Sequence, residues 1–213
     1  MVTMKQFETR SEWLEGRKNT IGGSDAAAVL GMSPWVTNVG LWEQKTGGAE
    51  QKEVRNDLVT YGQEAEQYLR QLFSLDFPEV KVFYEENNLF LNDKFPWAHA
   101  SLDGWLEDKI GRRGVLEIKT ANPMSSIQLQ KWRGRIPDYY YIQVLHEMAV
   151  YDADFAIVKA QLKRVVNGDL LIEARHYSFE RDEDEISYLM KQEEEFYKHI
   201  ETNTRPGLIL PEF

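Results

Sequence analysis

Residues 114–121, GVLEIKTA, set an acid and a base two positions apart in a segment with the alternation of a β-strand. Because successive side chains of a strand point to opposite faces, Glu117 and Lys119 share one face. Leu116 and Ile118 share the other face, which is apolar and must pack against another element. The segment therefore predicts a strand inside a sheet, with a charged pair on its second face.

The rest of the chain predicts helices and strands arranged around this strand. Apolar positions at helical spacing, with capping residues such as Ser24 and Thr37, indicate helices, and alternating runs indicate strands. Asn167 and Gly168 form a favoured hairpin turn between the last two strands. Helices are expected at 24–31, 37–47, 61–75, 137–152 and 180–201, and strands at 79–86, 88–108, 112–121, 154–162 and 170–179. This order predicts an α/β fold with a mixed sheet between helices.

Length and composition indicate one folded domain over residues 1–213. Hydrophobic residues make up 42% of the chain and aromatic residues 12%, which suits a sizeable core and not a disordered chain. We expect an N-terminal helical segment at about 10–50, a core at about 60–180, and an acidic helix with a tail at 181–213. No internal repeat or low-complexity tract interrupts these parts.

Cysteine is absent from the sequence, which excludes disulfides, thiolate zinc sites, iron–sulfur clusters and cysteine nucleophiles. The N-terminal residues form no apolar signal segment, and no apolar run is long enough to span a membrane. We therefore expect a soluble protein of the cytoplasm, with no membrane partner.

The formal net charge of −10 argues against a protein that coats nucleic acid, because Lys and Arg dominate contacts with phosphates. The distribution of charge matters more than its sum. Acids crowd residues 180–201, whereas residues 109–120 and 130–137 are rich in Lys and Arg. We expect an acidic outer helix and a positively charged inner surface.

Asp103 and Glu117 are expected to converge, because the hairpin 107–113 would pair the two strands that carry them. Two nearby carboxylates repel each other unless a cation lies between them, and Mg²⁺ accepts one or two carboxylates together with waters and phosphate oxygens. Lys119, on the face of Glu117, could orient or help deprotonate an attacking water, or offset charge on a phosphate. The pattern suits phosphodiester hydrolysis, although an exposed hairpin with ordinary charged residues also explains it.

Five segments resemble, in the same order, those of the YqaJ-like viral recombinases, the family of the phage lambda-type exonucleases. They are GRKNTIGGSDAAAVLGMSPWVTNVGLWEQKTG from Gly16, YGQEAEQYLRQLF from Tyr61, HASLDGWL from His99, GVLEIKTA from Gly114 and YYYIQVLHEMAVYD from Tyr139. The resemblance implies a restriction-endonuclease-like PD-(D/E)xK core in which helices flank a mixed central sheet. It also implies Mg²⁺-dependent 5′→3′ digestion of one strand of duplex DNA by a ring-shaped homotrimer.

The resemblance further implies a set of catalytic and metal-binding residues. Lys119 would be the catalytic lysine, and Gln143 would help order the site or hold the terminal phosphate. Glu66 fits the acid of the first long helix better than Glu64, because it lies four residues after Gly62. On the residues alone, Glu66 and Gln143 are equally well surface positions. The metal ligands would be Asp103, Glu117, the main-chain carbonyl of Ile118 and Glu66, which would hold two Mg²⁺ ions, with Mn²⁺ as a substitute.

By the same resemblance, the N-terminal segment matches a site for the 5′-terminal phosphate of DNA. Arg17, Ser24 and Ser101 would bind that phosphate. Arginine suits this role, since its planar guanidinium makes two charged contacts at once. On the residues alone, Ser24 is a helix cap and Arg17 a surface charge.

Three further features carry weaker signals. Lys131, Arg133 and Arg135 lie in one basic loop and would contact the DNA backbone, unless they are ordinary solvated charges. Trp35 could wedge against a terminal base pair, although we expect it in the core. His146 lies three residues after the candidate glutamine and could reach the site, yet no histidine has the spacing of a metal ligand.

The expected function is a Mg²⁺-dependent 5′→3′ exonuclease that degrades one strand of linear duplex DNA to mononucleotides. It would leave 3′ single-stranded overhangs for phage or prophage recombination. A 5′-phosphorylated end would be the preferred substrate and a single-strand annealing protein the partner. Two alternatives stay open: another PD-(D/E)xK nuclease that cuts DNA internally, and a nuclease-fold protein that binds DNA or a partner without cutting.

Overall fold

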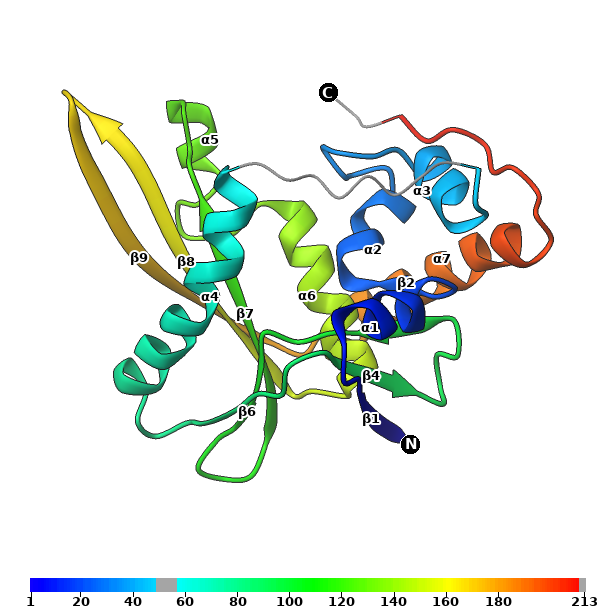
Figure 1. Cartoon of the computed structure of the whole chain (residues 1–213), viewed down its shortest axis with the longest axis horizontal. Coiled ribbons are helices and arrows are strands. Elements are labelled where there is room, and N and C mark those ends of the chain that lie inside the picture. Colours follow the sequence, from blue (N-terminus) through cyan, green and yellow to red (C-terminus); the bar gives the residue numbers. More distant parts are fainter. Residues whose placement is uncertain (49–56, 211–213) are drawn as a thin grey trace.

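The computed structural model describes residues 1–48 and 57–210, and their elements are shown in Figure 1. The helices are α1 (Arg10–Arg17), α2 (Gly23–Val29), α3 (Asn38–Lys45), α4 (Asp57–Asp76), α5 (Ser126–Gln130), α6 (Asp138–Tyr151) and α7 (Glu183–Glu201). The strands are β1 (Val2–Gln6), β2 (Ile21–Gly22), β3 (Lys81–Phe83), β4 (Asn88–Asn92), β5 (Ala98–Ala100), β6 (Gly104–Glu107), β7 (Arg113–Ala121), β8 (Phe155–Val166) and β9 (Asp169–Glu180).

The strands form two sheets. The larger sheet has the order β3-β6-β7-β8-β9, and it is mixed because β7 and β8 run parallel while the other pairs are antiparallel. The smaller sheet has the order β1-β4-β5-β2, and β2 is attached to β5 through only two residue pairs. The predicted α/β fold with a mixed sheet between helices is confirmed.

Strand β7 lies at the centre of the larger sheet, and its two faces pack against different helices. Val115 belongs to the core that contains α6, whereas Leu116 and Ile118 pack with Leu69 and Phe73 of α4. Burial of each such apolar side chain contributes about 2 kcal/mol to stability. The predicted apolar face of the strand is thus the face beneath α4, and the charged pair lies on the face of α6.

Helix α6 connects the parallel strands β7 and β8, since parallel neighbours require a crossover connection. Figure 1 places α6 at the centre of the molecule, between the larger sheet and helices α1 to α3. Ile142, Leu145 and Met148 are buried, as their helical spacing predicts. The helix therefore has a fixed position against the charged face of β7.

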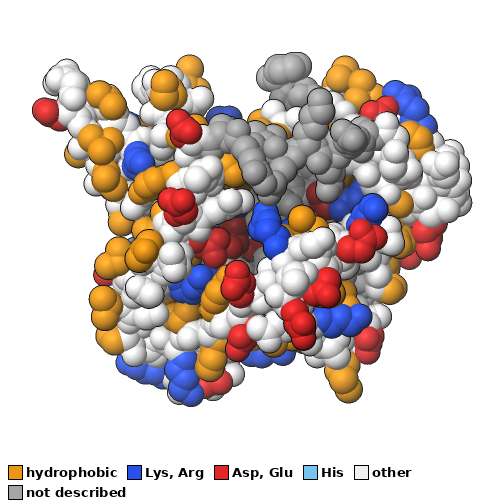
Figure 2. Space-filling model, in the orientation of Figure 1, with side chains coloured by type: hydrophobic (Ala, Val, Ile, Leu, Met, Phe, Trp, Pro, Cys, Tyr) orange, Lys and Arg blue, Asp and Glu red, His pale blue; other side chains and the backbone are white. Residues whose placement is uncertain are grey.

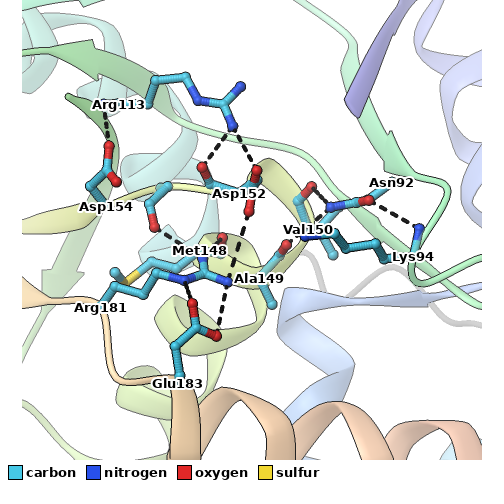
Figure 3. A network of polar contacts seen from close by, with 11 residues as sticks. Asn92, Lys94, Arg113, Met148, Ala149, Val150, Asp152, Asp154, Arg181 and Glu183 are labelled. Atoms are coloured by element: carbon cyan, nitrogen blue, oxygen red, sulfur yellow. Dashed lines mark hydrogen bonds and ion pairs between the residues drawn. The ribbon is translucent and has the colours of Figure 1, made fainter. Parts of the chain in front are cut away.

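A network of side chains holds the C-terminal end of α6, as Figure 3 shows. The last carbonyls of a helix have no partner within the helix itself. Arg181 donates hydrogen bonds to the carbonyls of Met148 and Ala153, at 3.1 and 3.0 Å. Asn92 and Arg113, from β4 and β7, bind further carbonyls of the same region. Three separate parts of the chain thus fix this end of the helix.

The start of α2 differs from the prediction, because Ser24 is not its cap. Helix α2 begins at Gly23, and Gly22 is the capping position. Asp25 reaches back and accepts a hydrogen bond from the Gly22 N–H at 3.0 Å. Asp25 thus supplies the side-chain contact, which leaves the Ser24 hydroxyl available for other partners.

The prediction of Trp35 in the core is wrong, since its side chain is 67% exposed. Trp35 lies in the loop between α2 and α3. The Ser33 hydroxyl accepts hydrogen bonds from the main-chain N–H groups of Trp35 and Val36, at 3.3 and 3.4 Å, and so fixes the loop at the surface. No helix in residues 1–48 and 57–210 has the length and apolarity needed to cross a lipid bilayer.

Candidate active site

A pocket of about 730 Å³ lies where α4, α6, β7 and the N-terminal helices meet. Figure 2 shows Asp and Glu side chains gathered at the centre of this face, beside Lys and Arg side chains. The predicted site residues that line the pocket are Arg17, Ser24, Glu66, Ser101, Asp103, Glu117, Ile118, Lys119 and Gln143. Segments far apart in the sequence therefore supply a single concave surface.

The β6–β7 hairpin brings Asp103 and Glu117 together, as its sequence predicts. Gly104 pairs with Leu116, so the residue before β6 lies beside Glu117. The Asp103 carboxylate accepts a hydrogen bond from the Ile118 N–H at 2.8 Å. Burial, together with the negative charges of Glu117 and Glu66, raises the pKa of Asp103 well above its usual range.

Lys119 provides the positive charge next to these carboxylates. Its Nζ lies 2.5 Å from Glu117 Oε1 and donates to Gln143 Oε1 at 2.9 Å. It also lies 4.6 Å from the ring centre of Tyr140. Burial favours the neutral amine, but the charges of Glu117 and Asp103 outweigh it and raise the pKa of Lys119. The side chain is therefore an ammonium group held in a defined position.

Gln143 of α6 connects three charged side chains of the pocket. Its carbonyl oxygen accepts from Lys119, while its Nε2 donates to Glu117 Oε1 and to Glu147 Oε1, both at 2.8 Å. Glu147 is 1% exposed, and its second oxygen has no hydrogen-bond partner among the described residues. Burial, followed by the charge of Glu117, raises the pKa of Glu147 well above its usual range. Both hydrogens of the Gln143 amide are thus occupied, which fixes its orientation.

Helix α4 contributes Glu66 and Arg70 to the pocket. The Glu66 carboxylate pairs with Arg70 Nη1 at 3.0 Å, and Arg70 also donates to the main-chain carbonyl of Asp103. The Arg70 guanidinium lies 3.4 Å from the ring centre of Tyr84. Glu64, the alternative acid, is exposed and does not line the pocket. The geometry therefore favours Glu66 over Glu64.

Arg17 occupies the end of the pocket formed by α1. Its guanidinium carbon lies 4.1 Å from the ring centre of Trp13, and its Nε donates to His99 Nε2 at 3.2 Å. Burial and the nearby positive charge of Arg17 hold the pKa of His99 well below its usual range, so His99 is neutral and accepts this bond. Trp13 Nε1 in turn donates to Ser101 Oγ at 3.2 Å. Arg17 and Ser101 are therefore linked through one tryptophan.

Four residues singled out in the sequence lie elsewhere. Lys131, Arg133 and Arg135 do not line the pocket and are exposed in the loop between α5 and α6. His146 does not reach the pocket, because its ring is buried on another face of α6. There it binds Glu193 and the main-chain carbonyl of His99, both at 2.8 Å.

Glu147 and Arg70 line the pocket although sequence reasoning did not select them. Each has a signal in its spacing, since Glu147 follows Gln143 by four residues and Arg70 follows Glu66 by four. Residues at this spacing share one face of a helix. That signal is weak, because exposed Glu and Arg residues occur at such spacings on most helices.

The pocket offers oxygen donors suited to a hard divalent cation. Asp103, Glu117 and Glu66 are three acids beside two cations, Lys119 and Arg70, and Glu147 adds a fourth acid. Mg²⁺ binds through one or two carboxylates and completes its shell with water and phosphate oxygens. Within the described ranges no three His, Asp or Glu side chains already form a complete ligand set. Two carboxylates with the Ile118 carbonyl fit Mg²⁺, and Glu66, shared with Arg70, would serve as an outer ligand.

A family model described as the YqaJ-like viral recombinase domain matches residues 12–154 of this chain. The chain belongs to the YqaJ-like viral recombinase family. The matched range contains Arg17, Asp103, Glu117, Lys119 and Gln143, and it includes every residue that lines the pocket except Arg10.

A relative within this family is the protein YqaJ of Bacillus subtilis (strain 168). It is 28% identical over 190 residues, which are 89% of this chain and 56% of YqaJ. The chain therefore spans little more than half the length of its curated relative.

Solved structures share the fold of this YqaJ-like chain at low sequence identity. The alkaline exonuclease LHK-Exo from Laribacter hongkongensis aligns with a TM-score of 0.69 and 20% identity, over 91% of this chain and 94% of that one. A phage-related exonuclease from Haemophilus somnus 129PT aligns with a TM-score of 0.56 and 14% identity, over 86% and 96%. These similarities confirm the predicted restriction-endonuclease-like PD-(D/E)xK fold.

Proposed function

We propose that this chain is a Mg²⁺-dependent exonuclease that degrades one strand of linear duplex DNA from its 5′ end. The observation that carries the proposal is one pocket that contains Asp103, Glu117 and Lys119 together with Arg17. Carboxylates beside a lysine suit hydrolysis of a phosphodiester, and a half-buried arginine suits recognition of a terminal phosphate. The exonuclease names of the structural neighbours agree with this chemistry.

The residues of the pocket divide the work of hydrolysis. Asp103, Glu117 and the Ile118 carbonyl would hold up to two Mg²⁺ ions, with Glu66 in the outer set. The chemistry that bound Mg²⁺ supplies is activation of water and neutralisation of charge on the phosphate and the leaving oxygen. Lys119 orients the attacking water and offsets the charge that develops on the phosphate. Gln143 keeps Lys119 and Glu117 in fixed relative positions.

The N-terminal end of the pocket would recognise the DNA end. Arg17, Ser24 and Ser101 would bind the 5′-terminal phosphate, and each cut would present a new 5′-phosphate to the same residues. The products would be mononucleotides and a 3′ single-stranded overhang. Such an overhang is the substrate of a single-strand annealing protein, which we expect as the partner in recombination.

We expect the active form to be a homotrimer, as the family resemblance implies. The β8–β9 hairpin supports an assembly, because Val165, Leu170 and Ile172 near its turn are exposed. Large exposed apolar patches on soluble proteins mark interaction surfaces. Light scattering of the purified chain should give the mass of a trimer, and a monomer at all concentrations would contradict this part of the proposal.

Linear duplex DNA labelled at either end tests the function. With Mg²⁺ present, labelled mononucleotides should appear first from the 5′ label, and chelation of Mg²⁺ should stop their release. Earlier release from the 3′ label would contradict the proposed direction.

Closed circular DNA is the matched control substrate. An exonuclease leaves it intact, whereas the alternative PD-(D/E)xK endonuclease cuts it. Absence of digestion on every substrate, with DNA binding retained, would favour the alternative of a nuclease-fold protein that does not cut.

A further inference from the structure

Trp35 presents a large aromatic surface outside the catalytic pocket. Its ring contacts the ring of Tyr139 edge-on, with 4.9 Å between the ring centres. The Ser33 hydroxyl fixes the loop that carries it. Burial of a large apolar side chain stabilises a fold, and this exposed tryptophan forgoes most of that stabilisation. An ordered, exposed tryptophan that already contacts a tyrosine edge-on is suited to hold a further flat group.

Positive charges lie beside these rings. A groove of about 510 Å³ contains Met32, Lys131, Arg135 and Tyr139 in its lining. Lys131 and Arg135, like the neighbouring Arg133, are exposed and form no ion pair within the described part of the chain. On a chain of net charge −10, such a group of unpaired cations favours a negatively charged ligand.

The same group of rings extends to Lys119, which lines the catalytic pocket. The ring of Tyr140 lies 4.5 Å from that of Tyr139 and 6.0 Å from that of Trp35, measured between ring centres. On its other side, Tyr140 contacts the ammonium group of Lys119. One ring, that of Tyr140, therefore lies between Trp35 and the candidate catalytic lysine.

We propose that Trp35 and Tyr139, together with Lys131 and Arg135, bind single-stranded DNA. Unpaired bases offer their faces to aromatic side chains, whereas the bases of a duplex are stacked on one another, and the phosphates between them pair with cations. The inference rests on the proposed function: the bound strand is the one left unpaired when its complement is digested at Lys119. The site would hold that strand beside the junction with the remaining duplex.

Binding of a fluorescent oligothymidylate with a 5′-hydroxyl end tests the site. The full chain is used with EDTA, so that no digestion occurs. The 5′-hydroxyl end leaves no terminal phosphate for Arg17 to bind. Trp35→Ala should weaken binding about 5- to 100-fold, as loss of base stacking does. Tyr188→Ala is the matched control, because Tyr188 is 60% exposed on α7 and distant from this surface in the sequence.

The cations are tested through the salt dependence of the same binding. Lys131→Ala combined with Arg135→Ala should weaken binding and reduce the slope of log affinity against log salt by about 1.4, since each phosphate contact to a single strand contributes about 0.7. Trp35→Ala should lower the affinity and leave the slope unchanged. Lys191→Ala, on the exposed side of α7, should change neither quantity.

Two results would overturn the proposal. One is an unchanged affinity of Trp35→Ala for the oligothymidylate, and the other is an equal loss of affinity for closed circular duplex DNA, whose bases are all stacked within the duplex. The binding assay requires no cleavage. If Trp35→Ala weakens single-strand binding but the wild type digests no DNA, the proposed function alone is refuted. If the wild type digests DNA and the Trp35→Ala variant binds the oligothymidylate as tightly as the wild type, only this binding site is refuted.

Discussion

Lys119 and Lys159 lie on neighbouring strands of one sheet, and each contacts a carboxylate, yet they face different surroundings. Lys159 is 2% exposed on the α4 face, 2.7 Å from Asp76 and 3.2 Å from His176. Lys119 lies on the α6 face, beside Glu117.

The difference lies in the balance of charge. Lys159 has one acid as its partner, and the rings of Phe73 and Phe77 lie against His176 beside it. Lys119 is the cation nearest a group of acids that includes Asp103 and Glu117, and their mutual repulsion persists in the folded chain. A lysine paired with one acid maintains a fold, whereas a cluster with more acids than cations favours a further cation and so points to function.

Neutralising one acid of the unbalanced cluster gives the largest expected effect. Glu117→Gln keeps the shape of the side chain but removes a proposed metal ligand, so we expect Mg²⁺-dependent digestion to fall by at least about 100-fold. The melting temperature should stay the same or rise, because repulsion with Asp103 is relieved. Lys159→Met is the control, and its digestion rate should match the wild type. Equal rates for Glu117→Gln and wild type would remove the cluster from the mechanism.

Glu147 tests whether geometry or charge matters at the edge of the cluster. Glu147→Ala frees one hydrogen of the Gln143 amide, and we expect kcat to fall by about 10- to 100-fold, as for other residues that orient a ligand. Glu147→Gln can still accept that hydrogen bond, so its kcat should recover towards wild type. If both variants lose activity equally, the charge of Glu147 is what matters and the positioning role is wrong.

Arg17 differs from both lysines, because no described carboxylate forms an ion pair with it. It packs on Trp13 and binds neutral His99, with no ion pair to any described carboxylate within 4 Å. Arg17→Ala should reduce the preference for 5′-phosphorylated over 5′-hydroxyl duplex by about 10-fold, the effect of losing one charged hydrogen bond. Initial rates on the two substrates measure this. A preserved preference would place phosphate recognition elsewhere.

The balanced pair gives the smallest effect, and it depends on pH. The hydrogen bond and charge of Lys159 lower the pKa of Asp76 below its ordinary 3.8. The ionised form therefore stabilises the folded chain above pH 3.8, and this contribution disappears as the pH falls through the lower pKa of the folded state. Asp76→Asn should lower the melting temperature near pH 7 by at most about 4 °C, and the gap should close in strong acid. A gap that is independent of pH would exclude the ion pair as its cause.

Sequence periodicity predicted the elements that carry the catalytic side of the pocket. A strand is the conformation that buries the alternating apolar residues of 114–121 on one face, and a helix does the same for the spaced apolar residues of 137–152. The patterns therefore predicted β7 and α6. The hairpin between Asp103 and Glu117 followed because neighbouring strands with a short connection pair antiparallel. Local pattern and burial were sufficient there.

The remaining features depend on contacts between distant segments, which no local pattern contains. Ser24 was predicted as a cap because serine favours that position. The capping position is instead Gly22, and its N–H donates to Asp25 within the helix. Trp35 was predicted in the core because tryptophan is large and apolar, and only the positions of Ser33 and Tyr139 explain its exposure. Glu147 had the sequence of an ordinary helical acid, and its burial arises from packing against α2.

The contact of Arg181 with the end of α6 has a consequence for the order in which the protein is made. Ribosomes synthesise a chain from its N-terminus, and domains generally fold as units once their residues have emerged. Gln143 and Glu147 are synthesised before β8 and β9, but Arg181, which binds the carbonyls of Met148 and Ala153 at the end of their helix, is synthesised after both strands. A nascent chain that stops short of Arg181 therefore carries every candidate catalytic residue but lacks one of the three contacts that fix the end of the helix holding two of them. Any property of the candidate site that depends on this contact would then appear only after Arg181 has emerged from the ribosome.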